Sequence, residues 1–161
     1  MSVARYITPE GARRLRDELD QLWRVKRPRA TQAVAEAAAM GDRSENAEYI
    51  YGKKLLREID GRIRFLRKTM DCLRVVDRIP HDTDRIYFGA WVRLRDEEEN
   101  VHTYHIVGPD ESDAQKGFIS VNSPMAKALL KKSERDEIIV RKPGGEALFT
   151  VIGISYEAFD S

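Results

Sequence analysis

The sequence is poor in the features that mark secreted and membrane proteins. Cys72 is the one cysteine among 161 residues, so no internal disulfide can form, and we expect a free thiol on a helix in a reducing cytoplasm. No apolar run approaches the roughly 20 residues of a membrane-spanning helix, and no N-terminal segment has the pattern of a signal peptide. We therefore expect a cytoplasmic protein without a membrane partner.

The sequence also lacks the motifs of a self-contained active site. It contains no Gly-rich phosphate loop, no Cys/His spacing typical of a metal site, and no Ser/His/Asp arrangement. His102 and His105 lie three residues apart on a predicted strand, where alternate side chains face opposite sides. We interpret them as surface or cross-strand histidines rather than metal ligands.

Charge is nearly balanced over the whole chain but not within it. Residues 1–76 carry 17 Lys and Arg against 11 Asp and Glu, a net charge of +6, whereas residues 77–161 carry 11 against 16, a net charge of −5. This asymmetry predicts two modules with different contact surfaces. We expect a helical domain over residues 1–76 and a second domain over residues 77–161.

The first module has the pattern of two long helices. Thr8 suits the N-cap and Pro9 the first position of the first helix, while Pro28 should kink or interrupt it. Its apolar residues follow the 3-4 spacing of a coiled-coil seam: Ala12, Leu15, Leu19, Leu22, Ala30, Ala33, Ala37 and Met40. The second seam is more regular: Tyr49, Gly52, Leu56, Ile59, Ile63, Leu66, Met70 and Leu73. Two helices joined by a few residues must run antiparallel, so we expect a hairpin roughly 50 Å long, with Gly52 as its weak point.

The second module predicts a small antiparallel sheet with one helix, which makes the chain α+β in class. Strand-like runs at 86–95 and 101–107 flank the acidic turn "DEEEN", and "KGFISV" is a third candidate strand. Ser123 and Pro124 are placed to cap and begin a short helix that ends near Lys131. Residues 136–142 and 148–156, joined by "PGGE", complete the sheet as a final hairpin.

The segment "MGDRSENAEY", residues 40–49, joins the two predicted helices and allows two interpretations. Asp42 could be the N-cap of the second helix, with Glu45 at the spacing of a capping box. Alternatively, the two carboxylates form a reactive tip. Mg²⁺ often binds through one or two carboxylates together with ligands from a partner, so such a tip would suit an incomplete metal site in another molecule.

Longer motifs resemble a known family. "GDRSENAEYIYGKK" looks like the tip of the bacterial Gre (GreA/GreB) transcript-cleavage factors. "REIDGRIRFLRK", "FGAWV", "IVGPDE" and "ISVNSPMAKALLKK" resemble the GreB branch more than the GreA branch, and the resemblance runs from about residue 6 to 156. It implies an N-terminal antiparallel coiled-coil hairpin, with its tip at about residues 40–48, and a C-terminal FKBP-like domain that docks on the polymerase.

The resemblance also implies a function. A monomer would bind bacterial RNA polymerase, its hairpin would enter the secondary channel, and its tip would help the polymerase active site to cleave the 3′ segment of backtracked RNA. Asp42 and Glu45 match the two tip acids that help to hold a Mg²⁺ shared with the polymerase. Ser44 would assist in positioning, and Arg43 would steady the RNA phosphate or the channel wall. No cofactor would be stably bound, and no independent enzyme activity is expected, because two carboxylates on a rod cannot assemble a complete site.

Two further sets of residues carry expected roles. Lys53, Arg57, Arg64 and Lys68 are spaced 4, 7 and 4 apart, interrupted by Asp60; they form either a solvated flank or, as in GreB-like proteins, a basic patch that contacts the extruded RNA 3′ segment. In the second domain, Asn122, Ser123 and Pro124 match the segment that faces the helical rim of the polymerase channel. The family usually has Asp at the first of these positions, so Asn122 is a departure, and Gly52 is another where GreB proteins often have Asn.

Three other functions compete with this one. A channel-binding regulator without cleavage stimulation would share the rod, but the intact pair of tip acids argues against it. A prolyl isomerase could share the FKBP-like fold, although no aromatic-lined pocket is evident and a fold alone does not establish activity. A general RNA-binding protein would bind RNA without polymerase.

Overall fold

A computed structural model describes residues 5–41 and 45–159. These residues group into two compact units, which we call the hairpin unit (residues 12–73) and the sheet unit (residues 5–11 and 74–159). The domain limits expected from the charge distribution, 1–76 and 77–161, stay a prediction. In the structure, residues 5–11 group with the sheet unit. No helix in the described part of the chain is both long and apolar enough to cross a membrane.

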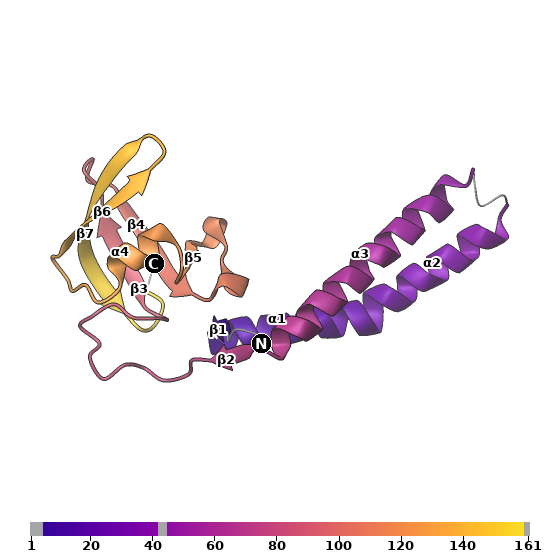
Figure 1. The fold of residues 1–161 in the computed structure, drawn as a ribbon, viewed down its shortest axis with the longest axis horizontal. Coiled ribbons are helices and arrows are strands. Elements are labelled where there is room, and N and C mark those ends of the chain that lie inside the picture. Colours follow the sequence, from indigo (N-terminus) through magenta and orange to yellow (C-terminus); the bar gives the residue numbers. More distant parts are fainter. Residues whose placement is uncertain (1–4, 42–44, 160–161) are drawn as a thin grey trace. The chain divides into compact units, whose positions relative to one another are not determined.

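The first arm of the hairpin unit is one helical path (Figure 1), and it includes a π-helical segment. It consists of α1 (Pro9–Gln21), η1 (Leu22–Lys26) and α2 (Arg27–Ala39), with helical backbone angles at both junctions. At the end of η1 the Arg27 N–H bonds to the Leu22 carbonyl, five residues back. Pro28 lacks an N–H and its ring crowds the preceding turn, so the wider π turn accommodates it. The irregularity expected at Pro28 therefore lies just before it, and the helix continues.

The second arm, α3 (Ala47–Met70), lies antiparallel to α2 (Figure 1). Its predicted seam is buried at Ile59, Ile63 and Leu66, which are 7%, 3% and 0% exposed. The last predicted seam residue, Leu73, instead begins strand β2 (Leu73–Val75). The second arm is therefore 24 residues long, or about 36 Å, and shorter than expected.

The seam of α2 departs from its expected line toward the end of the helix. Ala30 and Ala37 are buried as predicted, but Ala33 is exposed and Met40 is 79% exposed. Val34 packs at this position instead. It lies so close to Gly52 that a Cβ atom added to Gly52 would be 2.9 Å from the Val34 Cγ2 atom. Gly52 thus lets the two helices approach closely at this position, and its expected role as the weak point of the hairpin stays a prediction.

The sheet unit contains a five-stranded sheet in the order β5-β4-β3-β7-β6. The strands are β3 (Trp91–Arg95), β4 (Val101–Val107), β5 (Phe118–Ser120), β6 (Glu137–Lys142) and β7 (Gly145–Ser155). The two predicted hairpins, β3–β4 and β6–β7, are confirmed as antiparallel pairs. β5, however, pairs parallel with β4, because the short 3₁₀ segments η2 (Pro109–Glu111) and η3 (Ala114–Lys116) return the chain to the start of a new strand. The α+β class is confirmed.

One hydrophobic core holds the sheet and helix α4 (Pro124–Leu129) together. Burial alternates along β6, where Ile138 is 4% exposed and its neighbour Ile139 is 59% exposed. Helix α4 contributes Ala126 and Leu129, both fully buried, and Ser123 caps it by accepting a hydrogen bond from the Ala126 N–H at 3.2 Å. The predicted cap and start of this helix are confirmed, although the helix ends at Leu129 rather than near Lys131.

The segment before α1 is held within the sheet unit. Strand β1 (Arg5–Ile7) pairs with β2, and neither strand was expected. Glu111 of η2 accepts hydrogen bonds from the Thr8 and Gly108 N–H groups at 2.9 and 2.7 Å. Thr8 in turn accepts a hydrogen bond from the Gly11 N–H at 3.1 Å, which confirms its predicted role as the cap of α1.

Candidate functional site

The end of the hairpin is organised by Asn46, not by the predicted capping box. Asn46 is the N-cap of α3: its side-chain Oδ1 accepts a hydrogen bond from the Tyr49 N–H at 3.2 Å. Its Nδ2 donates to the Ala37 carbonyl of α2 at 2.6 Å. Asn46 thus satisfies one free group at the end of each helix, which a carboxylate could not do because it has no donor. The first interpretation of the segment, a capping box of Asp42 and Glu45, therefore does not describe the start of α3, whose N-cap is Asn46.

This correction leaves Glu45 outside the helix and its cap. Glu45 is an exposed turn residue one position before Asn46. Asp42, Arg43 and Ser44, the other predicted tip residues, lie outside the described residues. The part of the tip that is described therefore presents a carboxylate to solvent, and carboxylate oxygens are the ligands that Mg²⁺ prefers.

The four predicted RNA-binding residues, Lys53, Arg57, Arg64 and Lys68, all lie on α3 and are exposed; we call them the basic stripe. None of the four makes an ion pair within the described part of the chain. Asp60, which interrupts the stripe, is neutralised by Arg27 of α2, whose Nε lies 2.7 Å from the Asp60 Oδ1. The negative charge in the stripe is thus compensated by the first arm, and the four cations remain available to a ligand.

The opposite flank of the hairpin has a different character. Arg62 donates two hydrogen bonds to Glu18 at 2.6 and 2.9 Å, and these bonds hold the pKa of Glu18 below its usual value. Beside this pair runs a groove of about 610 Å³, lined by Leu22, Lys26, Arg29, Ala30, Ala33, Leu55, Glu58, Ile59 and Arg62. Cations on this flank are paired or mixed with carboxylates. On the basic stripe, by contrast, no cation is in an ion pair within the described part of the chain.

The predicted docking residues Asn122, Ser123 and Pro124 lie in the sheet unit at the start of α4. Asn122 and Pro124 are exposed and Ser123 is partly buried, since its hydroxyl caps the helix. The Asn122 N–H donates to the Ser120 Oγ at 3.1 Å. The capping role of Ser123 is therefore real, and it leaves the two flanking side chains on the surface.

The two histidines of β4 face opposite sides of the sheet, as predicted. His102 Nε2 lies 2.8 Å from the Asp96 Oδ2, and this contact holds the pKa of Asp96 below its usual value. His105 stacks on Trp91 of the neighbouring strand, with ring centroids 4.0 Å apart. Within the described residues, no group of three or more His, Cys, Asp and Glu side chains could hold a metal ion.

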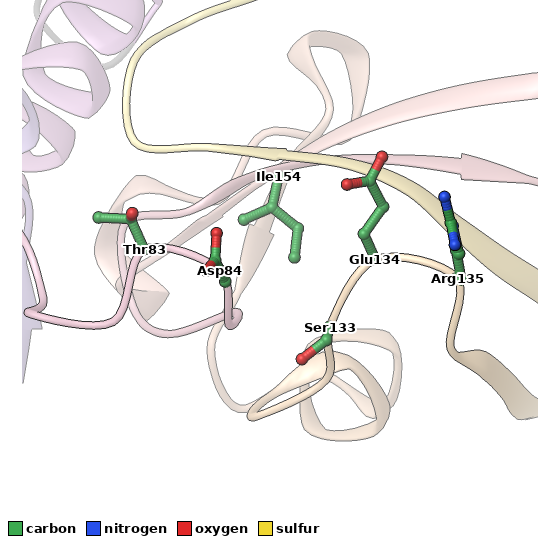
Figure 2. Close-up of a pocket in the computed structure, with 6 residues that line it drawn as sticks. All are labelled: Thr83, Asp84, Ser133, Glu134, Arg135 and Ile154. Carbon is green, nitrogen blue, oxygen red and sulfur yellow. The ribbon is translucent and has the colours of Figure 1, made fainter.

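A hollow of about 360 Å³ in the sheet unit tests the alternative of a prolyl isomerase. Figure 2 shows Ile154 of β7 beside two loops, one with Thr83 and Asp84 and the other with Ser133, Glu134 and Arg135. Apart from Ile154 the lining is polar or charged, and it contains no aromatic side chain. Small-molecule and peptide pockets are mostly apolar and aromatic, so this hollow does not favour that alternative.

Sequence reasoning missed two features of the hairpin unit. The N-cap role of Asn46 had a local signal, because Asn is among the best N-cap residues and lies three positions before Tyr49. The second feature is the contact of Trp23 with Arg67 of the other arm, whose guanidinium carbon lies 4.7 Å from the ring centroid. This contact had no local signal, unlike that of Arg27, which is four residues after Trp23 and lies 5.6 Å from the centroid.

Comparison with known proteins gives matches over nearly the whole chain. Residues 5–75 match the family model described as "Transcription elongation factor, N-terminal", and residues 80–156 match "Transcription elongation factor, GreA/GreB, C-term". The curated transcription elongation factor GreB of Pseudomonas aeruginosa is 60% identical over 150 residues, which cover 93% of this chain and 89% of that protein. GreB of Yersinia pestis is 53% identical over 160 residues, covering 99% and 94%.

Among solved structures, GreA factor homolog 1 of Thermus thermophilus aligns with 96% of this chain and 99% of that one, with a TM-score of 0.43 and 24% identity. The sequence matches, and not this structural likeness, show the family of the chain.

Proposed function

The chain belongs to the GreA/GreB family of transcription elongation factors, and from this premise we propose that it stimulates cleavage of backtracked RNA by RNA polymerase. The hairpin enters the secondary channel of the polymerase and brings its tip to the active site, where the 3′ segment of the RNA is cleaved. The observation that carries this proposal is the exposed carboxylate of Glu45, which lies at the end of a long hairpin and outside the helix cap.

The tip acids are the proposed ligands. A Mg²⁺ shared with the polymerase would lower the pKa of the attacking water and stabilise the leaving oxygen. Glu45 fits such an ion, because Asn46 has taken over the capping role and the carboxylate oxygens stay available. Asp42 supplies the second carboxylate, Ser44 helps to position the tip, and Arg43 steadies an RNA phosphate or the channel wall.

The rest of the surface supports the same function. The basic stripe presents four exposed cations along the outside of α3, where phosphates of the extruded RNA can bind without sequence preference. In the sheet unit, Asn122, Ser123 and Pro124 dock on the helical rim of the channel. Asn122 carries no charge where the family usually has Asp, so this contact relies on hydrogen bonding rather than on an ion pair.

The protein has no nuclease activity of its own in this proposal. Mg²⁺ requires about six oxygen ligands, and a tip without an enclosing pocket supplies only a few of them. Rigorously polymerase-free protein should therefore leave labelled RNA intact over the same incubation. RNA cleavage under these conditions would contradict this part of the proposal.

The deciding experiment uses RNA polymerase stalled and backtracked on a template with end-labelled RNA, to which the protein and Mg²⁺ are added. The parent protein should shorten the transcripts. Asp42→Asn and Glu45→Gln remove the charge that metal ligation needs, and each should reduce the cleavage rate at least about tenfold while binding of the polymerase changes little.

Glu48→Gln is the matched control. Glu48 is an exposed carboxylate in the first turn of α3, three residues after Glu45, and the substitution removes the same charge. It should cleave like the parent. Parental cleavage by the double variant, at saturating protein and limiting Mg²⁺, would show that the tip acids are not ligands. Binding without any cleavage by the parent would identify a channel-binding regulator instead.

A further inference from the structure

We propose that Trp23 is a stacking platform for a nucleobase of the single-stranded RNA that the basic stripe holds. This inference rests on the proposed function, since it concerns the RNA extruded from the polymerase. It adds a contact to the base, whereas the basic stripe contacts only phosphates.

Trp23 lies on the surface of the π-helical segment η1 and is 48% exposed. The guanidinium carbon of Arg67 lies 4.7 Å from its ring centroid, and that of Arg27 lies 5.6 Å away. Arg27 comes from the first arm and Arg67 from the second, so the two cations hold the indole between the arms. The residue as a whole nevertheless keeps 48% of its surface exposed to solvent.

Ion pairing shows which flank Trp23 occupies. Arg27 contacts Trp23 and also binds Asp60 at 2.7 Å. Asp60 lies three residues after Arg57 and four before Arg64, a spacing that places all three on one face of α3. Trp23 therefore borders the basic stripe and lies away from the groove on the opposite flank.

This combination matches the chemistry of single-stranded RNA. Proteins bind such strands with a basic track for the phosphates and with aromatic side chains on which bases stack, and Arg guanidinium groups also stack on bases. Stacking tolerates any sequence, because every base has a π-face. A tryptophan used only for packing would be largely buried, whereas Trp23 is 48% exposed and borders the basic stripe.

The position of Trp23 predicts when the contact forms. Trp23 precedes Ala39, the last residue of α2, by 16 positions, which is about 24 Å along the helix. RNA cleaved at the tip reaches Trp23 only when several nucleotides have been extruded. The contact should therefore contribute to the rescue of deeply backtracked complexes and not of shallow ones.

The first test needs no polymerase. The fluorescence of Trp23 is obtained as the difference between the parent protein and Trp23→Phe. It is followed during titration with a single-stranded oligouridylate and with an abasic oligoribose phosphate of equal length. The base-bearing strand should change the signal and bind at least about fivefold more tightly than the abasic strand, with a similar salt dependence. Equal signals and equal affinities would overturn the proposal.

The second test measures cleavage in shallow and deep backtracked complexes. Trp23→Ala should slow the rescue of deep complexes several-fold and leave shallow ones unchanged, and Trp23→Phe, which keeps an aromatic face, should restore most of the rate. Phe65→Ala is the matched control, because Phe65 is 44% exposed with the Arg62 guanidinium carbon 5.2 Å from its ring centroid, on the other flank. Parental rates for Trp23→Ala, or an equal loss for Phe65→Ala, would overturn the proposal.

A third variant separates this inference from the function on which it rests. Replacing Lys53, Arg57 and Lys68 together with Ala should also impair the deep complexes. If this variant loses activity and Trp23→Ala does not, the stripe binds RNA and the stacking proposal alone fails. If the parent protein cleaves nothing, the proposed function fails, and the polymerase-free titration still decides whether a base stacks on Trp23.

Discussion

The hairpin unit and the sheet unit bury their apolar side chains in different geometries. In the sheet unit, five strands and α4 enclose one core, in which Leu94, Ile106 and Leu129 have no exposed surface. In the hairpin unit, the buried residues form a line between two helices, and Leu66 is the one large side chain without exposed surface among the described residues of that unit. A hairpin therefore leaves most of its side chains in solvent.

This difference explains where the candidate functional residues lie. A two-helix seam constrains about two residues in every seven and leaves the others free to carry charge. The basic stripe and Trp23 occupy such free positions, and Glu45 lies in the turn outside the helices. The sheet unit uses many of its polar groups internally, as Glu111 does when it holds the Thr8 and Gly108 N–H groups.

The largest effect should come from the enclosed core. Ile138→Ala in β6 should lower the free energy of unfolding by about 2–5 kcal/mol, because it leaves a cavity that its neighbours cannot fill. Ile139→Ala removes the same atoms from the next residue of the strand, which is 59% exposed, and should change stability by less than about 0.5 kcal/mol. Urea denaturation followed by tyrosine and tryptophan fluorescence measures both. Similar losses for the two variants would contradict the one-sided burial of β6.

A smaller effect is expected where the two hairpin arms meet. Asn46→Ala removes both the cap of α3 and the bond to the Ala37 carbonyl, and should cost about 1–3 kcal/mol. Asn46→Ser keeps a good N-cap acceptor but its hydroxyl is too short to replace the cross-helix bond, so it should cost only about 0.5–1.5 kcal/mol.

Thermal denaturation followed by the helical circular dichroism signal is the measurement for both Asn46 variants. If Asn46→Ser were as stable as the parent, the contact across the hairpin would have no energetic value, and the two ends of the arms would be stabilised separately.

The smallest effect should come from the exposed flank of the hairpin. The pKa of Glu18 is lowered from its ordinary value of 4.5, chiefly by hydrogen bonding to Arg62. The pair therefore stabilises the fold fully above pH 4.5, and the contribution is lost as the pH falls through the lower folded-state pKa. Because the Glu18 side chain is 37% exposed, solvent screening limits the gain to well under about 1 kcal/mol.

Glu18→Gln should thus lower the melting temperature slightly at neutral pH, and the difference from the parent should disappear in acid and shrink at high salt. Glu58→Gln, on the same flank but without an ion pair among the described residues, is the control and should show no such pH dependence. A difference between Glu18→Gln and the parent that persists in acid would mean that Glu18 acts through packing and not through its charge.

The sequence by itself determined the features that depend on neighbours along the chain. Apolar residues at every third or fourth position predicted α3 and its seam, and Ile59, Ile63 and Leu66 are buried there. The same periodicity placed the basic stripe on the solvent side of that helix. Thr8 and Ser123 were recognisable as caps, because an N-cap bonds an N–H group three residues ahead. These predictions succeeded since helices repeat with a fixed local period.

Only the tertiary structure decided the features that depend on a partner distant in sequence. The side-chain amide of Asn46 donates a hydrogen bond to the Ala37 carbonyl of the other arm, a contact across the hairpin that its local cap role did not reveal. Val34 replaces Ala33 at the seam because Gly52 leaves it room. β5 pairs parallel with β4, and Trp23 lies beside Arg67, through contacts that no local pattern encodes. The physical reason is the same in each case: the deciding atoms become neighbours only after the chain has folded.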